Sequence, residues 1–127
     1  MHSEVQLLNK TKGKLPRLPF SDMKNAVLGE DYELSLVFVD EAESHKINVQ
    51  TRGKDKPTNI LSFPLDEHSG EIFICPSYAK SEAPNFDRPY ENYLAFLFIH
   101  GLVHLKGFDH GVRMENEELK YRKQFGI

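Results

Sequence analysis

The longest apolar stretch of the chain lies in its C-terminal third. Between Tyr90 and Lys106 apolar residues occupy most sides of a helical pattern, and Gly107 follows as a typical helix stop. A helix that is apolar on most sides is buried in the middle of a domain. Its most apolar run, near Leu94–Ile99, is far too short to cross a bilayer. The pattern therefore predicts a central, buried helix.

Strands are predicted in the first two-thirds of the chain, where apolar and polar residues alternate. Residues 33–39 alternate most clearly and are rich in β-formers. Residues 60–65 and 71–75 predict a hairpin with a loop of about five residues. Pro64, near the end of the first of these segments, points to an edge strand or a strand end. A weaker alternation at residues 5–9 brings the number of strands to about four.

Shorter helices are predicted where a capping residue or a proline precedes a helical segment. They are expected to span residues 21–28 (with Ser21 or Asp22 as the cap), 40–49 (capped by Asp40), 76–81 and 114–124. With the central helix this makes about five. Because the strands come first and the longest helix follows, we expect an α+β fold. It is a single domain over residues 1–127, with a small mixed sheet packed against helices and the central helix carrying the candidate metal ligands.

Composition and charge are those of an ordinary globular protein. Apolar residues make up 39% of the chain and charged residues 28%, and the net charge is −3. Cys75 is the single cysteine, which rules out an intrachain disulfide and agrees with a reducing compartment. The first residues lack the basic and apolar segments of a signal peptide. We expect a cytoplasmic protein with no membrane partner.

The negative net charge argues against a non-specific nucleic-acid coat protein. The average hides two basic runs, which are separated from the acidic clusters. One comprises Lys10, Lys12, Lys14 and Arg17, and the other comprises Arg52, Lys54 and Lys56. A surface divided in this way can bind a polyanion on one face, although two solvated loops produce the same pattern.

Three histidines near the end of the predicted central helix are the strongest chemical feature. His100 and His104 lie four residues apart, so both project from one helix face. Gly107 allows a sharp turn that can return His110 to the same metal ion. Three neutral imidazoles leave a fourth tetrahedral position to water, as in a catalytic zinc site. The spacing predicts one zinc ion per chain, although imidazoles bind nickel and copper well too.

The same histidine spacing occurs in metzincin proteases. Those enzymes need a glutamate directly after the first histidine as general base. Here Gly101 occupies that position, so the chain has the metal ligands of a protease without its base. A metalloprotease is therefore the weakest of the interpretations. A glycine there also allows another backbone or a substrate to approach closely.

The segment His-Gly-Leu-Val-His-Leu-Lys-Gly-Phe-Asp-His, from His100 to His110, resembles the signature of the YbeY family of bacterial metal-dependent endoribonucleases. Further matches follow in the order of that family, at Asn48, Arg52, Pro57–Pro64, Gly70–Ile74, Met114, Glu115 and Glu118. The resemblance spans roughly residues 34–125. Asn59 departs from it, because the family usually has aspartate there.

The resemblance implies hydrolysis of phosphodiester bonds in single-stranded RNA, at the 3′ end of small-subunit ribosomal RNA. It also implies a part in ribosome biogenesis and quality control, with the small subunit and its assembly factors as partners and no DNA substrate. Catalytic roles would fall to Arg52 and the three histidines, with Arg52 gripping a phosphate through its forked guanidinium. Lys54 and Lys56 would steer the RNA, and Lys106 is a weaker candidate. A zinc ion would polarise a phosphoryl oxygen and lower the pKa of its water to about 7.

The residues leave some alternatives open. Asp109 either orients a histidine as a hydrogen-bond acceptor or caps the turn. If Asp109 or Cys75 completed the metal shell, the zinc would be structural, and the protein would be a ribosome-assembly factor with little cleavage of its own. Most aromatic residues are expected in the core. The candidates for stacking on RNA bases are Phe63, Tyr78, Phe86 and Phe108.

Overall fold

The computed structural model describes residues 4–127, which form an α+β domain with five α-helices and a four-stranded mixed sheet, as the sequence predicts. In chain order the elements are β1 (Gln6–Asn9), α1 (Phe20–Leu28), β2 (Glu33–Phe38), α2 (Glu41–Arg52), β3 (Ile60–Asp66), β4 (Ser69–Ile74), α3 (Pro76–Glu82), the 3-10 helix η1 (Ala83–Phe86), α4 (Tyr90–Leu105) and α5 (Val112–Phe125). Among residues 4–127, no helix combines the length and the apolar character needed to cross a membrane.

The sheet has the strand order β1-β2-β4-β3. β1 and β4 both run parallel to β2, and β3 runs antiparallel to β4. Because β3 pairs only with β4, Pro64 lies on an edge strand, where its missing N–H costs no ladder hydrogen bond. The predicted five-residue hairpin loop is wrong. Only Glu67 and His68 separate the strands, because Asp66 Oδ1 accepts a 2.7 Å hydrogen bond from the His68 N–H and closes a tighter turn.

The helix boundaries differ from the predicted ones where capping was judged from residue type alone. α1 begins at Phe20 after Pro19, and neither Ser21 nor Asp22 caps it. The Ser21 hydroxyl accepts a 2.9 Å hydrogen bond from the backbone N–H of Val5 instead. Asp40 does cap α2, accepting from the Glu43 N–H at 2.9 Å. α2 continues to Arg52, past the predicted end at residue 49.

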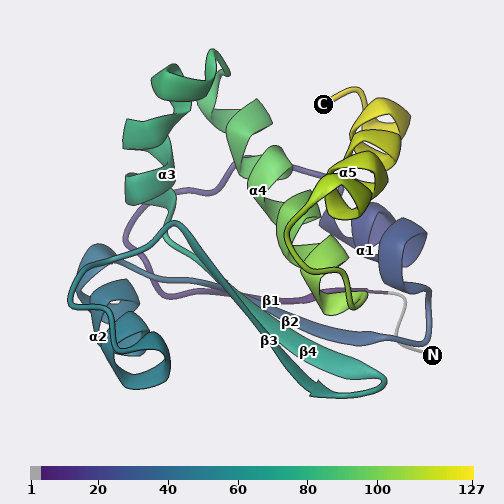
Figure 1. The fold of residues 1–127 in the computed structure, drawn as a ribbon. Helices are drawn as coiled ribbons and strands as arrows, with labels where there is room; N and C mark the ends of the chain where they lie inside the picture. The colour runs from purple at the N-terminus through teal and green to yellow at the C-terminus, as the bar shows by residue number, and fades with distance from the viewer. Residues whose placement is uncertain (1–3) are drawn as a thin grey trace.

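The helix α4 is the centre of the helical layer. Figure 1 shows α3 on one side of it and α1 and α5 on the other, while α2 stands apart at the end of the sheet. The sheet contributes Leu36 and Phe38 of β2, which pair with Ile72 and Ile74 of β4, and all four side chains are fully buried. Each such burial contributes roughly 1.5–3 kcal/mol. The α4 side chains that face this sheet and the neighbouring helices, among them Leu94, Phe98 and Leu102, are fully buried too, which confirms the predicted central, buried helix.

Gly101 lies where α4 passes close to the sheet. A β-carbon at this position would lie 2.8 Å from Ile60 Cδ1, 2.9 Å from Ser62 Oγ and 3.1 Å from Ile72 Cδ1. Contacts this short force neighbouring groups to move, so the packing admits no larger side chain without rearrangement. The close approach brings the flanking turns of α4, which carry His100 and His104, up to the edge strand β3.

Candidate metal centre

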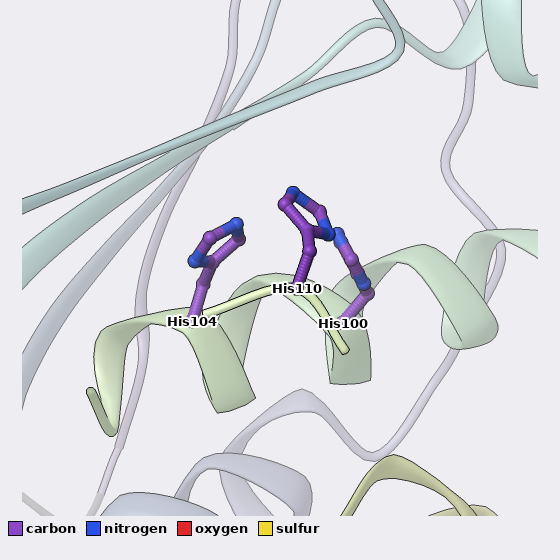
Figure 2. Close-up of side chains that lie close together, drawn as sticks. All are labelled: His100, His104 and His110. Carbon is purple, nitrogen blue, oxygen red and sulfur yellow. The ribbon is translucent and has the colours of Figure 1, made fainter. Parts of the chain in front are cut away.

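The helix α4 and the loop that follows it bring the three histidines together. His100 and His104 are one turn apart on α4, and Gly107 turns the chain back with a φ of 107°. Figure 2 shows the ring of His110, from that loop, meeting the two helical rings on one side of α4. Ring centroids are 4.9 to 5.5 Å apart, and the closest set of ligand nitrogens lies within 4.8 Å of one another. This spacing allows all three to bind one metal ion.

The histidine cluster has no fourth protein ligand among residues 4–127. Cys75 is 1% exposed and contacts the Ser77 hydroxyl. Asp109 lines the same groove as the histidines, but its carboxylate is not part of the ligand group. Neither of the residues that would have closed the site therefore belongs to the ligand group, and a tetrahedral ion held by the three histidines would have one position open to water or substrate.

A buried carboxylate of α5 supports the cluster from behind. Glu118 Oε1 lies 3.1 Å from His100 Nδ1, and the Glu118 side chain is 7% exposed. When Nδ1 donates to this carboxylate, Nε2 keeps its lone pair for a metal ion. Glu118 thus makes a contact of the kind predicted for Asp109, whose own role stays a prediction. The acidic residues of the last predicted helix were the available signal, but sequence spacing does not show which of them faces α4.

The donor set of the site fits zinc. It consists of nitrogens alone, which suit zinc, nickel and copper better than the oxygen-seeking magnesium or calcium ions. Burial lowers the pKa of His104, and the neighbouring His100 and His110 lower it further. A lowered pKa keeps the imidazole neutral at physiological pH, which is the form that binds a metal ion.

The histidines line an open groove of about 620 Å³ against the edge strand β3. Arg52, the last residue of α2, is far from the histidines along the chain but lines the same groove. Residues of β3, from Ile60 to Pro64, line this groove as well. The structure therefore brings together Arg52 and all three histidines, the four residues singled out from the sequence for catalysis.

The loop that follows Arg52 is held by two buried polar side chains of α2. The Ser44 hydroxyl donates to the Thr58 carbonyl at 2.8 Å and accepts from the Thr58 N–H at 2.9 Å. The Asn48 amide donates to the Lys56 carbonyl at 2.8 Å. Gly53 begins the loop in a left-handed conformation, with φ of 66°. These contacts fix the course of the chain between Arg52 and β3.

Asn59 belongs to a polar network behind the groove. Its amide nitrogen donates to Glu82 Oε1 at 3.0 Å, and the Tyr93 hydroxyl donates to the same oxygen at 3.2 Å. Burial, with Glu82 nearby, raises the pKa of Tyr93 to about 12. An aspartate at position 59 would place a second carboxylate against Glu82, so the amide suits this network.

The lysines lie differently. Lys54 and Lys56 are exposed in the loop after Arg52, outside the groove lining, and their contact with RNA stays a prediction. Lys106 turns toward α5, where its ammonium donates to Glu117 and to the Tyr121 hydroxyl, both at 2.8 Å.

The four aromatic candidates separate as well. Phe63 and Phe108 line the histidine groove, and Phe86 lines a neighbouring one. Tyr78 lines neither of these grooves.

Comparison with known proteins decides the family. The sequence model of the family described as endoribonuclease YbeY matches residues 11–125. The chain belongs to the YbeY endoribonuclease family. The YbeY match reaches further toward the N-terminus than the resemblance over residues 34–125 had indicated. A solution structure of a Thermotoga maritima protein is similar, with 28% identity and a TM-score of 0.70, covering 96% of this chain and 89% of that one.

Membership in the YbeY family supports a hydrolase that cuts RNA internally, with a role in ribosomal RNA processing. The three histidines are close enough to supply a metal site for it. Arg52 and the histidine groove both lie within the matched residues.

Replacing Glu118 with glutamine is expected to weaken zinc binding about 10- to 100-fold, the usual cost of losing a carboxylate behind a metal-binding histidine. The variant keeps the size of the side chain but removes the charge that fixes the His100 tautomer. Competition with a chromogenic chelator measures the affinity. Glu117→Gln is the matched control, because Glu117 lies on the same helix as Glu118 but pairs with Lys106 and not with a histidine. Equal zinc affinity in the two variants would remove Glu118 from the site.

Proposed function

We propose that this protein is a zinc-dependent endoribonuclease that cuts single-stranded RNA and matures the 3′ end of small-subunit ribosomal RNA. The observation that carries the proposal is the shared groove, in which an open cluster of three histidines lies with Arg52. His100, His104 and His110 hold the ion, one per chain. When bound, the ion supplies a Lewis acid that polarises a phosphate oxygen and activates water.

The protein residues around the ion bind and orient the substrate. Arg52 is exposed at the end of α2, and its guanidinium can donate two parallel hydrogen bonds to one phosphate group. Glu118 fixes the ring of His100. Charge builds up on the phosphate during cleavage, so a cation held in place before the reaction lowers the barrier.

The shape and lining of the groove support a preference for single strands. It is open and partly apolar, with Phe63 and Phe108 along its sides. Unpaired bases can turn out of their stack and rest on such rings, whereas a duplex keeps its bases inside. Lys54 and Lys56 add positive charge beside Arg52 and steer the strand inward. The small subunit with its assembly factors supplies the RNA, in the cytoplasm.

One assay tests the proposal. Zinc-loaded protein is incubated with a labelled single-stranded RNA, the same RNA as a duplex, and an unfolded protein. We expect cuts in the single strand, little cleavage of the duplex, and no loss of the protein. Chelation of zinc and the His100→Ala variant are both expected to stop the reaction.

Three outcomes would overturn the proposal. Cleavage that persists in the chelated enzyme and in His100→Ala would exclude the metal mechanism. Digestion of the unfolded protein alone would favour a protease. Tight zinc binding without any RNA cleavage would favour an assembly factor with a structural ion.

A further inference from the structure

A second groove adjoins the histidine groove on the far side of the cluster. It has a volume of about 590 Å³ and lies between η1, α4 and α5. His100 and His110 line both grooves, so the two are continuous through the metal site. Figure 1 shows α4 and α5 packed side by side, the two helices that flank this groove. A chain that passes the histidines can therefore continue into it.

The lining of this groove includes apolar side chains that the core does not bury. Phe86 is 50% exposed and Leu119 is 42% exposed. The Phe86 ring is stacked on Tyr93, with centroids 5.0 Å apart and planes 22° from parallel. Tyr93 is stacked in turn on Phe96, at 5.8 Å and 17°. Phe96 also lies beside Phe86, with centroids 6.3 Å apart and planes tilted by 38°, so the three rings form a compact cluster that supports the exposed Phe86 ring at the groove.

The polar groups of the groove suit a base better than a phosphate. Glu115 and Asn116, both exposed at the start of α5, line it, and so does the buried Glu118. Carboxylates repel a phosphate, but they accept hydrogen bonds from the amino and imino groups of nucleobases. Arg122 offsets part of this charge, with its guanidinium 3.7 Å from Glu118 and 5.1 Å from the centroid of Phe96.

The geometry points to a nucleobase subsite in this groove, in which the base next to the scissile phosphate stacks on Phe86. This inference rests on the proposed function, because an RNA strand held at the histidines must extend to both sides of the cut. One side follows β3 and Arg52, and the other enters the groove between α4 and α5. Flat rings bind unpaired bases with little regard to sequence, whereas Glu115 and Asn116 favour bases with donor groups.

The experiment tests whether Phe86 and one particular base of the RNA contribute to the same contact, by removing each of them singly and both together. A fluorescent single-stranded RNA of 12 nucleotides is made with one abasic site, moved along the strand one position at a time. Its Kd for the zinc-loaded full chain is measured by fluorescence anisotropy at 4 °C. Gels of the same samples check that the RNA is still uncut at the time of the measurement. In the unmodified protein we expect one abasic position near the cut to weaken binding about tenfold. In Phe86→Ala the intact RNA binds about tenfold more weakly, and the abasic penalty at that position disappears.

Two further variants keep the result interpretable if Phe86→Ala unfolds. Phe86→Tyr retains the ring and is expected to keep both the affinity and the abasic penalty. Leu8→Ala removes an apolar side chain that is 55% exposed on β1, at the opposite edge of the sheet, and is expected to change neither. Melting temperatures of all variants report on folding.

An abasic penalty of the same size in folded Phe86→Ala would overturn the subsite. Unchanged RNA affinity in that variant would do so too, and it is the result expected if the groove binds a protein segment instead. Absence of an abasic penalty at every position in the unmodified protein would also exclude it. Failure of the proposed function is a separate observation, namely no zinc-dependent cut by the unmodified chain.

Discussion

Replacing His104 with alanine is expected to weaken zinc binding strongly and to abolish RNA cleavage while leaving the fold intact. The His104 ring lies 5.4 Å from that of His100 and 4.9 Å from that of His110, and burial lowers the pKa of His104, which favours the neutral form that a metal ion needs. Each ligand carries a share of the zinc-binding free energy, so losing one of three ligands costs about 3–5 kcal/mol and weakens zinc binding at least ~100-fold. Zinc titration calorimetry and initial cleavage rates measure the two effects.

His68→Ala is the control for that experiment, because His68 is exposed in the β3–β4 turn, away from the histidine groove. We expect it to retain zinc affinity and activity. The melting temperature of zinc-free His104→Ala should match that of the zinc-free parent protein, since the imidazole is only partly buried. Cleavage at the parental rate by His104→Ala with no bound zinc would show that the reaction does not use this site.

The fold was predictable for the elements whose burial is visible as a regular pattern of apolar residues in the sequence. α4 is apolar on most sides, and β2 alternates, so both elements followed from the pattern of residues. The failures lie where a tertiary contact competes with local preference. Ser21 looks like a helix cap in sequence but is bound to the backbone of Val5, 16 residues away. The η1 turn at residues 83–86 has no periodicity to reveal it.

The candidate site was predictable only as far as its ligands are local. His100, His104 and His110 lie within eleven consecutive residues, so helix geometry and one glycine are enough to bring them together. Glu118 comes from another helix, and its contact with His100 depends on how α4 and α5 pack. The spacing of residues in the sequence does not predict this helix packing, so the contact of Glu118 with His100 is visible only in the structure.

Gly101 is informative both in the sequence and in the structure. In the sequence it argues against a metzincin protease, because it occupies the position of that enzyme's general base. In the structure the position faces β3 and β4 so closely that a β-carbon would lie 2.8 Å from Ile60 Cδ1. A glutamate therefore has no room there without displacing the sheet. The same closeness places the histidines against the edge strand, which is how α4 and β3 come to form two walls of one groove.

Replacing Arg52 with alanine is expected to lower kcat/KM for single-stranded RNA about 100- to 1,000-fold without changing zinc affinity. Arg52 is the one cationic side chain of the described residues that lines the histidine groove, and the clamps from Ser44 and Asn48 hold the loop that follows it. Arg52→Lys should recover only part of the loss, because an ammonium cannot make two parallel hydrogen bonds to a phosphate. Single-turnover cleavage and zinc titration on the same preparations separate the two effects.

Lys46→Ala provides the control, since Lys46 is an exposed cation on the same helix that lies outside the groove. It removes the same charge from the protein, so any loss it shares with Arg52→Ala reflects long-range attraction of RNA. That shared part should shrink as salt is added, because salt screens charges beyond about 8–10 Å. The remainder, which persists at high salt in Arg52→Ala alone, measures contact with the phosphate at the groove. Equal rates for Arg52→Ala and Lys46→Ala at every salt concentration would limit Arg52 to steering and leave phosphate binding to the metal alone.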